Sequence, residues 1–275
     1  MSSPEWQDLL IPGTDVLRNL HNRSPAQPYG TADPGLLAHL ENHFAMLRLW
    51  ELDVTPLAGP LDYTYMQRIH GYIFRDTYEW AGQQREVPWD GPMSKVGPAV
   101  VKGDPAHVQY YYLPAREIGA AASAAYADLA KDNYLTGRRR RDFVDGLARH
   151  WGRINQIHSF REGNTRSQFA FFRTLCADAG WTLDTTKFGA GPLRDEFVAA
   201  RFFYQRSGGD HSRLAAALNQ GISAPEITGN RAQRLLDVAL QRERPAVDVQ
   251  SRFSPAHHVP AVQTEPFRGP APEAG

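Results

Sequence analysis

A short segment, residues 158–166, combines a histidine, a glutamate, a glycine, an asparagine and two arginines. Imidazole can take a proton near neutral pH, carboxylate oxygens bind Mg²⁺, and guanidinium groups bind phosphate. Transfer of a phosphorus-containing group needs these functions together, because it depends on positioning, on neutralised phosphate oxygens and on one group that receives the nucleophile's proton. The segment therefore predicts a phosphate-handling site.

Two helical patterns flank this segment and would position it. Apolar residues recur at helical spacing from Asp142 to Ile157 and again from Asn164 to Ala179. His158 would then lie just past the end of the first helix, and Gly163 with the N-cap residue Asn164 would begin the second. A helix start presents unpaired backbone N–H groups and the positive end of the helix dipole, which together bind anions.

The residues HSFREGNTR at 158–166 resemble the motif HPFx(D/E)GNGRxxR of the Fic family. In that family the motif lies between two helices, and the usual reaction transfers AMP from ATP to a Ser, Thr or Tyr hydroxyl of a target protein. The resemblance implies that His158 is the general base and that Glu162 binds Mg²⁺, the expected cofactor, at the α- and β-phosphates. It also implies that the phosphates of ATP are bound by Arg161, Gly163, Asn164, Thr165 and Arg166.

Three positions depart from the family motif. Ser159 replaces a proline, Thr165 replaces the second glycine, and Phe169 stands where the last arginine is usual. That arginine helps to hold the γ-phosphate in many members, so Thr165 and Phe169 bear on how the triphosphate is oriented. Arg173, one turn farther along, is expected to substitute weakly for it.

The resemblance covers residues 28–222 and implies an all-α Fic fold, a helical bundle with a short β-hairpin flap over the active site. Beyond the two helices beside the motif, helices are expected from Pro34, from Leu61 to Phe74, from Pro105 to Lys131, from Leu193 to Tyr204 and from Arg213 to Leu218. Residues 83–101, rich in Gly and Pro, should form the flap. In the family the flap pairs with an extended stretch of the target, which places target docking at Gln84, Arg85, Glu86, Val87 and Pro88.

Composition agrees with one catalytic domain of residues 28–222, preceded by an extension of residues 1–27 and followed by a Pro-rich tail, residues 223–275, expected to be disordered. Lys plus Arg and Asp plus Glu number 30 each, so no global field favours nucleic acid or anionic lipid. The single Cys176 fits a reducing compartment, and no stretch approaches the roughly twenty apolar residues of a membrane span. The expected localisation is cytoplasmic.

Many Fic enzymes are inhibited by a helix bearing (S/T)xxxE(G/N), whose glutamate pairs with the motif's last arginine. No Ser or Thr of this chain completes that pattern. The chain therefore resembles the class in which a toxin is inhibited by a separate small antitoxin protein. The expected partners are ATP, a target protein docked at the flap and such an antitoxin, with no membrane and no nucleic acid.

Other functions remain open at this point. A Doc-like protein kinase would use the same fold to transfer the γ-phosphate, but that branch has a lysine near position 165 and an alanine near position 163, where this chain has Thr165 and Gly163. A Fic-fold binding module with weakened catalysis is supported by Thr165 and Phe169. A metal hydrolase built on His150, His158 and Glu162 lacks an evident third ligand and general base.

Overall fold

The computed structural model describes residues 6–224, so the tail predicted for residues 223–275 lies almost wholly outside the described residues. Within the described part, the α-helices are α1 (Pro34–Val54), α2 (Tyr63–Phe74), α3 (Ala115–Lys131), α4 (Arg140–Ile157), α5 (Asn164–Asp178), α6 (Pro192–Arg206) and α7 (Ser212–Gly221). Two small antiparallel sheets accompany them, β1 (Met93–Pro98) with β2 (His107–Tyr112) and β3 (Thr182–Leu183) with β4 (Ile222–Ser223). The prediction of a helical bundle with a short β-hairpin is confirmed.

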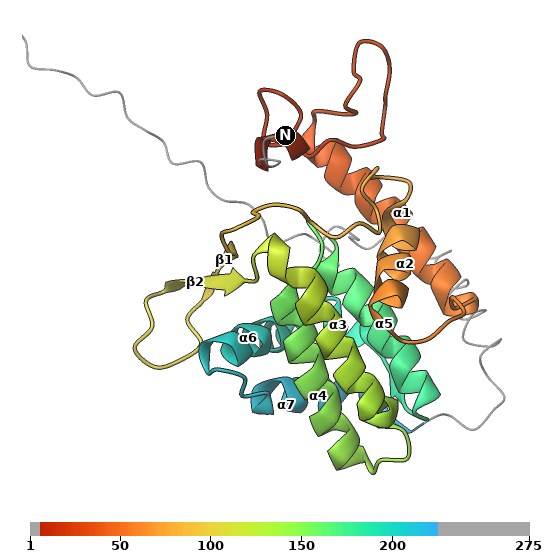
Figure 1. Cartoon of the computed structure of the whole chain (residues 1–275), viewed down its shortest axis with the longest axis vertical. Helices are drawn as coiled ribbons and strands as arrows, with labels where there is room; N and C mark the ends of the chain where they lie inside the picture. Colours follow the sequence, from red (N-terminus) through yellow and green to blue (C-terminus); the bar gives the residue numbers. More distant parts are fainter. Residues whose placement is uncertain (1–5, 225–275) are drawn as a thin grey trace, which may run out of the picture.

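Helix α4 lies at the centre of the bundle. Its Phe143, Leu147 and Trp151 have no exposed surface, and the helix packs against α3, α5, α6 and α7. In Figure 1, α1 and α2 lie to one side of this centre, whereas α6, α7 and the β1–β2 hairpin lie to the other. The 158–166 segment joins α4 to α5, so it begins at the end of this buried helix. It lies between the α1–α2 side of the bundle and the side formed by α6, α7 and the hairpin.

Helix α1 begins at Pro34, as the sequence predicted, whereas α2 begins at Tyr63 within the predicted segment Leu61–Phe74. The Asp33 carboxylate accepts hydrogen bonds from the backbone N–H groups of Gly35 at 2.8 Å and Leu36 at 3.0 Å, and Pro34 occupies the first turn of α1. The Asp62 carboxylate caps α2 through the N–H of Tyr65 at 2.8 Å. Helix α2 then packs against both α1 and α5, so two well-capped helices support one side of the 158–166 segment.

The β1–β2 hairpin lies farther along the chain than expected. Its strands pair from Met93 opposite Tyr112 to Pro98 opposite His107, so residues 107–112 are a strand and the helix predicted over 105–131 begins only at Ala115. The segment HVQYYY is rich in β-branched and aromatic residues, which favours a strand once a partner is present, and that partner lies outside any local helical window. The hairpin packs against α6 (Figure 1).

The docking segment predicted at residues 84–88 is therefore not the hairpin. It precedes β1 and lies against the bundle, with the side chains of Arg85 and Val87 3% exposed. The loop composition predicted for residues 83–101 is correct for most of that range. Of the predicted docking residues, Arg85 and Val87 are buried, whereas Glu86 between them is exposed.

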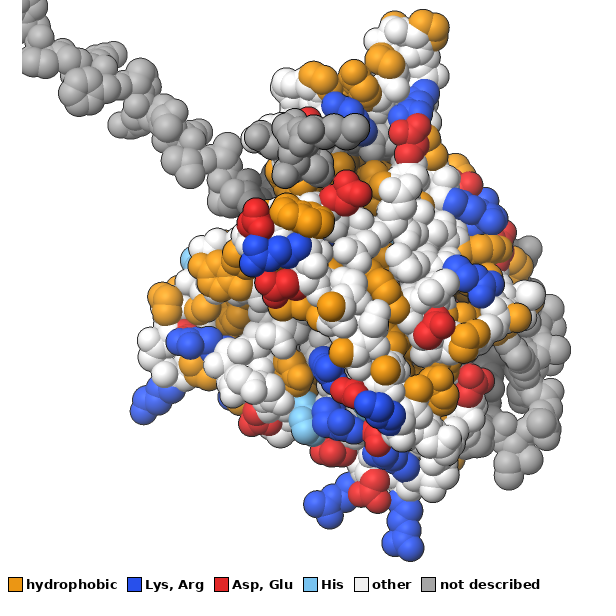
Figure 2. Space-filling view, viewed as in Figure 1, with side chains coloured by type: hydrophobic (Ala, Val, Ile, Leu, Met, Phe, Trp, Pro, Cys, Tyr) orange, Lys and Arg blue, Asp and Glu red, His pale blue; other side chains and the backbone are white. Residues whose placement is uncertain are grey.

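The surface carries charges of both signs. Figure 2 shows acidic and basic side chains interspersed on one face, in keeping with equal numbers of acidic and basic residues in the chain. No helix between residues 6 and 224 is long and apolar enough to cross a membrane.

Candidate active site

His158 stands at the junction of α4 and the loop. Helix α4 ends at Ile157, and His158 adopts a left-handed conformation, with φ 52° and ψ 61°, that turns the chain away from the helix axis. The residue is 4% exposed, and its ring stacks on that of Tyr112 in β2, with the ring centroids 4.0 Å apart. The predicted base is thus held between the end of the central helix and the hairpin.

Arg85 binds the loop backbone beside His158. Its Nε donates to the carbonyl of His158 at 2.8 Å and its backbone N–H to the carbonyl of Ser159 at 2.9 Å, while the two Nη atoms donate to the carbonyls of Val87 and Leu113. Burial lowers the pKa of this guanidinium to about 10, which leaves it charged at neutral pH. Arg85 therefore joins three segments and holds the loop, a role the sequence did not predict.

Asn164 closes the loop on itself. Its side-chain oxygen accepts from the N–H of Phe160 at 3.0 Å, and its Nδ2 donates to the Phe160 carbonyl at 2.7 Å. Phe160 is buried and stacks on His70 of α2 with the ring centroids 3.9 Å apart. Asn164 is the first residue of α5, and the N-cap is Gly163, so the prediction of Asn164 as the cap was wrong: its side chain binds back to the loop.

Gly163 leaves the start of α5 open to an anion. It has φ 78°, and a Cβ built on it would lie 2.2 Å from the Phe74 ring, so both backbone conformation and space require glycine. The N-cap residue Gly163 has no side chain that could cap the first turn of α5. The N–H groups of that turn and the positive end of the helix dipole are groups that can bind an anion, the role that the sequence analysis expects of this turn.

Glu162 faces this helix start. Its Oε1 accepts from the N–H of Gly163 at 2.9 Å, its carbonyl accepts from Nε2 of His70 at 3.0 Å, and its side chain is 24% exposed. No group of three or more His, Cys, Asp or Glu residues within 6–224 could hold a metal ion by itself. A single accessible carboxylate beside an anion site nevertheless fits Mg²⁺, which is usually bound by one or two carboxylates together with substrate phosphates.

Arg166 extends from the first turn of α5 toward α1. Its Nη2 pairs with Oε1 of Glu41, whose Oε2 accepts from the hydroxyl of Tyr78, and the guanidinium lies 4.6 Å from the centroid of the Phe74 ring. Sequence reasoning missed Glu41. The available signal was that Glu41 lies four residues from Leu37 and four from Ala45 on the buried stripe of α1, where a carboxylate needs a partner.

Two further cations belong to this region, one on the loop and one on the β1–β2 hairpin. The Arg161 guanidinium lies 3.6 Å from the centroid of the Trp6 ring, and burial lowers its pKa to about 10. Burial also lowers the pKa of Lys95 in β1. The negative charge of Glu162 raises this pKa, and the positive charges of Arg201 and Arg161 lower it further. The hairpin therefore contributes a lysine near the site, which sequence reasoning did not identify.

Two of the three positions that depart from the family motif, Thr165 and Phe169, contact residues of α6. Thr165 is exposed, and its hydroxyl accepts from Nη1 of Arg201 at 2.9 Å. Phe169 packs in an aromatic cluster with Trp151, Phe188 and Phe197 at centroid distances of 5.0, 5.4 and 5.1 Å.

Two residues from the weaker sequence hypotheses bind acidic partners. Arg173, expected to substitute for the motif's last arginine, pairs instead with Asp53 near the end of α1, so that expectation was wrong. His150, the extra ligand of the hydrolase hypothesis, contacts Asp132 through Nε2 at 2.9 Å.

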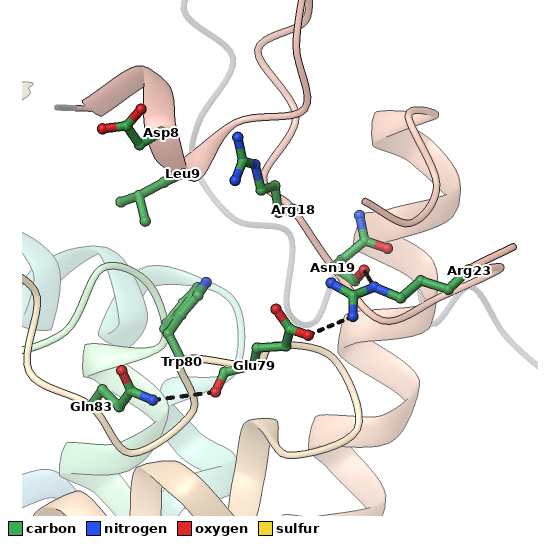
Figure 3. Close-up of a pocket in the computed structure, with 8 residues that line it drawn as sticks. All are labelled: Asp8, Leu9, Arg18, Asn19, Arg23, Glu79, Trp80 and Gln83. Atoms are coloured by element: carbon green, nitrogen blue, oxygen red, sulfur yellow. Dashed lines mark hydrogen bonds and ion pairs between the residues drawn. The ribbon is translucent and has the colours of Figure 1, made fainter. Parts of the chain in front are cut away.

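A separate cleft of about 220 Å³ lies between the N-terminal segment and the loop after α2. Figure 3 shows its lining, in which Arg23 pairs with Glu79 at 2.5 Å and Nε2 of Gln83 donates to the Glu79 carbonyl at 3.5 Å. Trp80 forms part of the wall and stacks on His70, which in turn contacts Phe160 of the loop. None of the residues predicted for the active site lines this cleft.

Comparison with known proteins shows what this chain is similar to. It is 26% identical over 253 residues to the protein adenylyltransferase VbhT of Bartonella schoenbuchensis, covering 92% of this chain and 46% of VbhT. It is 31% identical to the probable protein adenylyltransferase y4lH of Sinorhizobium fredii, covering 78% of this chain and 95% of that protein. The chain thus spans about half the length of VbhT but almost all of y4lH.

Solved structures agree on the fold. The BepC protein of Bartonella tribocorum, crystallised with bound AMPPNP, matches 80% of this chain and 98% of its own with a TM-score of 0.63 at 22% identity. A model of the Fic/DOC family matches residues 60–176, the range that contains α2, the hairpin and the His158 loop. Together with the similarity to y4lH, this match shows that the chain belongs to the Fic/DOC family.

Proposed function

We propose that this chain is a protein adenylyltransferase, which transfers AMP from ATP to a Ser, Thr or Tyr hydroxyl of a target protein. The observation that carries the proposal is the position of His158, a buried imidazole held next to an uncapped helix start with the carboxylate of Glu162 beside it. A proton acceptor, an anion site and a carboxylate are the groups that transfer of a nucleotidyl group requires. The relatives VbhT and y4lH carry this activity in their names.

In the proposed reaction, the N–H groups at the start of α5 bind the phosphates of ATP, together with Arg161 and Arg166 of the 158–166 segment. The target's hydroxyl oxygen attacks the α-phosphorus, the bond from this phosphorus to the oxygen of the β-phosphate breaks, and pyrophosphate leaves. His158 receives the hydroxyl proton. Mg²⁺ bound at Glu162 would neutralise charge on the phosphate oxygens. Tyr112 and Arg85 hold the ring and backbone of His158 in place for this step.

The β1–β2 hairpin is the proposed docking element for the target, in place of residues 84–88. Its two strands pair with each other and with no further strand within residues 6–224, and Val96 and Tyr111 are 67% and 55% exposed. Unpaired strand edges can bind an extended segment through backbone hydrogen bonds. Because β2 also carries Tyr112, a segment bound there would lie close to His158.

Labelling with isotopic ATP tests this proposal. Incubation of the chain with Mg²⁺, bacterial lysate and ATP labelled at the α-phosphate should label protein, whereas ATP labelled at the γ-phosphate should not. Replacement His158→Ala should lower labelling by about 10²–10⁴-fold, the usual contribution of a general base. His211→Ala is the matched control, because His211 lies at the start of α7 and contacts Asp145.

Label from the γ-phosphate alone would instead establish the kinase reaction. Binding of ATP without any label would favour the binding module. Unchanged labelling by the His158→Ala variant would refute the assigned base.

The separate antitoxin expected from the sequence remains a prediction. If it is correct, a small protein bearing (S/T)xxxE(G/N) is encoded next to this chain and suppresses the labelling when it is added. An adjacent protein of this kind that leaves labelling unchanged would contradict it.

A further inference from the structure

Arg201 of α6 reaches the loop from the side opposite to Arg166. Its Nη1 donates to the hydroxyl of Thr165 at 2.9 Å and to Oδ1 of Asn155 at 3.3 Å. Its Nε is buried and has no hydrogen-bond partner among the described residues. Arg201 therefore joins α4, α5 and α6 at the first turn of the helix that forms the anion site.

The charge of Arg201 is not compensated as that of Arg166 is. Arg166 pairs with the Glu41 carboxylate on the other side of the loop. Arg201 contacts neutral oxygens, and no carboxylate within residues 6–224 pairs with it. A partly buried cation without a counter-charge is costly in a folded protein, and an anion bound next to it removes that cost.

The aromatic cluster around Phe169 positions the Arg201 guanidinium beside the start of α5. Its guanidinium lies 4.7 Å from the centroid of the Phe197 ring, one turn earlier on α6, and the Phe197 ring lies 5.1 Å from Phe169. Phe169 occupies the position where the sequence motif usually has an arginine, one turn after Thr165 on α5. Phe169 thus belongs to the apolar support of Arg201, and the cation at this side of the helix start comes from α6.

We propose that Arg201 binds the outer phosphates of ATP and so gives the site its preference for a nucleoside triphosphate. The inference rests on the proposed function, in which ATP is the donor. The phosphates would lie at the start of α5, between Arg201 and the Arg166 side of the loop, with Lys95 of the hairpin nearby. Loss of Arg201 should therefore weaken binding more with each additional phosphate on the nucleotide.

The test measures the affinity of the full chain for ATP, ADP and AMP, with Mg²⁺ present, by isothermal titration calorimetry. For Arg201→Gln, the Kd of ATP should rise about tenfold or more while that of AMP changes by less than about twofold. Arg201→Lys, which keeps the charge, should recover part of the ATP affinity. Arg206→Gln is the matched control, because Arg206 is on the same helix, 51% exposed and paired with Asp104.

The ratio of the ATP and AMP affinities is the deciding quantity, since a general loss of folded protein lowers both. An Arg201→Gln variant that binds ATP like the unaltered chain, or that loses ATP and AMP equally, overturns the role of Arg201 while the proposed function stands. An unaltered chain that binds no ATP overturns both.

Discussion

The two sides of the His158–Arg166 loop differ in how their charges are compensated. On the α1–α2 side, Arg166 pairs with Glu41, and the two ring nitrogens of His70 are bonded to the Gly82 N–H and the Glu162 carbonyl. On the hairpin–α6 side, Lys95 and Arg201 lie next to the loop, and Arg201 contacts neutral oxygens. Figure 1 shows these two groups of elements on opposite sides of the central helices.

This difference separates support from binding. On the α1–α2 side, Arg166 and both ring nitrogens of His70 are bonded within the protein, so this side determines the shape of the loop and gains little from a ligand. The hairpin–α6 side keeps positive charge that an anion would neutralise, so it should gain most from a bound nucleotide. Changes on the first side should therefore cost stability, whereas changes on the second should cost binding or turnover.

The largest effect is expected for Gly163→Ala on the supporting side. A Cβ there would lie 2.2 Å from the Phe74 ring in a residue with φ 78°, and clash and strain together should cost about 2–4 kcal/mol of unfolding free energy. Labelling should fall with it, because α5 must move to make room. The control is Gly180→Ala, which has φ 82° but no atom within 4 Å of its Cβ and should cost only about 1 kcal/mol. Equal costs in urea unfolding would show that Phe74 does not constrain the loop.

A smaller loss of stability is expected for Glu41→Gln. The side chains of Glu41 and Arg166 are 12% and 17% exposed, so removal of the carboxylate charge should lower the unfolding free energy by about 1–3 kcal/mol. The ratio of the ATP and AMP affinities should stay unchanged, in contrast with Arg201→Gln. Glu117→Gln is the control, since Glu117 is 47% exposed beside Arg116 and should cost less than about 0.5 kcal/mol. A changed ATP-to-AMP ratio for Glu41→Gln would end the distinction between the two sides.

The sequence predicted the loop better than its surroundings. Local rules of spacing and capping predict His158 at the end of a helix and Gly163 before α5. They also predict helix starts at Pro34 and in the Leu61–Phe74 segment, and the structure has all of these features. Where a helix begins and ends depends on residues within a few positions of each other, so the periodicity of the sequence is enough to predict it.

What the sequence did not predict depends on contacts between distant segments. The strand at residues 107–112 forms because residues 93–98 lie opposite, and Arg85 is buried because three backbone carbonyls surround it. Glu41 and Arg201 reach the loop from α1 and α6, about 120 residues before and about 40 after it in the chain. A pattern search confined to one segment cannot identify such residues, although a carboxylate on an apolar stripe signals that a partner exists.

On the binding side, Tyr112→Leu should lower turnover about tenfold by removing the ring on which His158 stacks. Tyr112→Phe keeps this ring and should retain most of the rate. The measurement is the labelling rate at saturating ATP, and the ATP affinity should not change in either variant. If the Phe and Leu variants lost the same activity, the hydroxyl of Tyr112 would matter and the stacked ring would not.

The smallest effect is expected in the pH dependence of stability on the supporting side. Burial lowers the pKa of His70 to about 3, whereas the residue titrates near 6.5 when the chain is unfolded, so between these values the unfolded chain binds a proton that the folded chain does not. The contribution of neutral His70 to stability is therefore complete above about pH 6.5. As the pH falls below that value, the unfolding free energy decreases by about 1.4 kcal/mol per pH unit.

His70→Asn should reduce the slope of unfolding free energy against pH by about one proton between roughly pH 5 and pH 6.5, whatever its effect on stability itself. Burial also lowers the pKa of His21 and His150, and both keep contributing to the slope in the variant, so the difference between the two slopes isolates His70. Identical slopes for the unaltered chain and His70→Asn would mean that His70 is open to protons, and the α1–α2 side would then not be the closed support that its hydrogen bonds indicate.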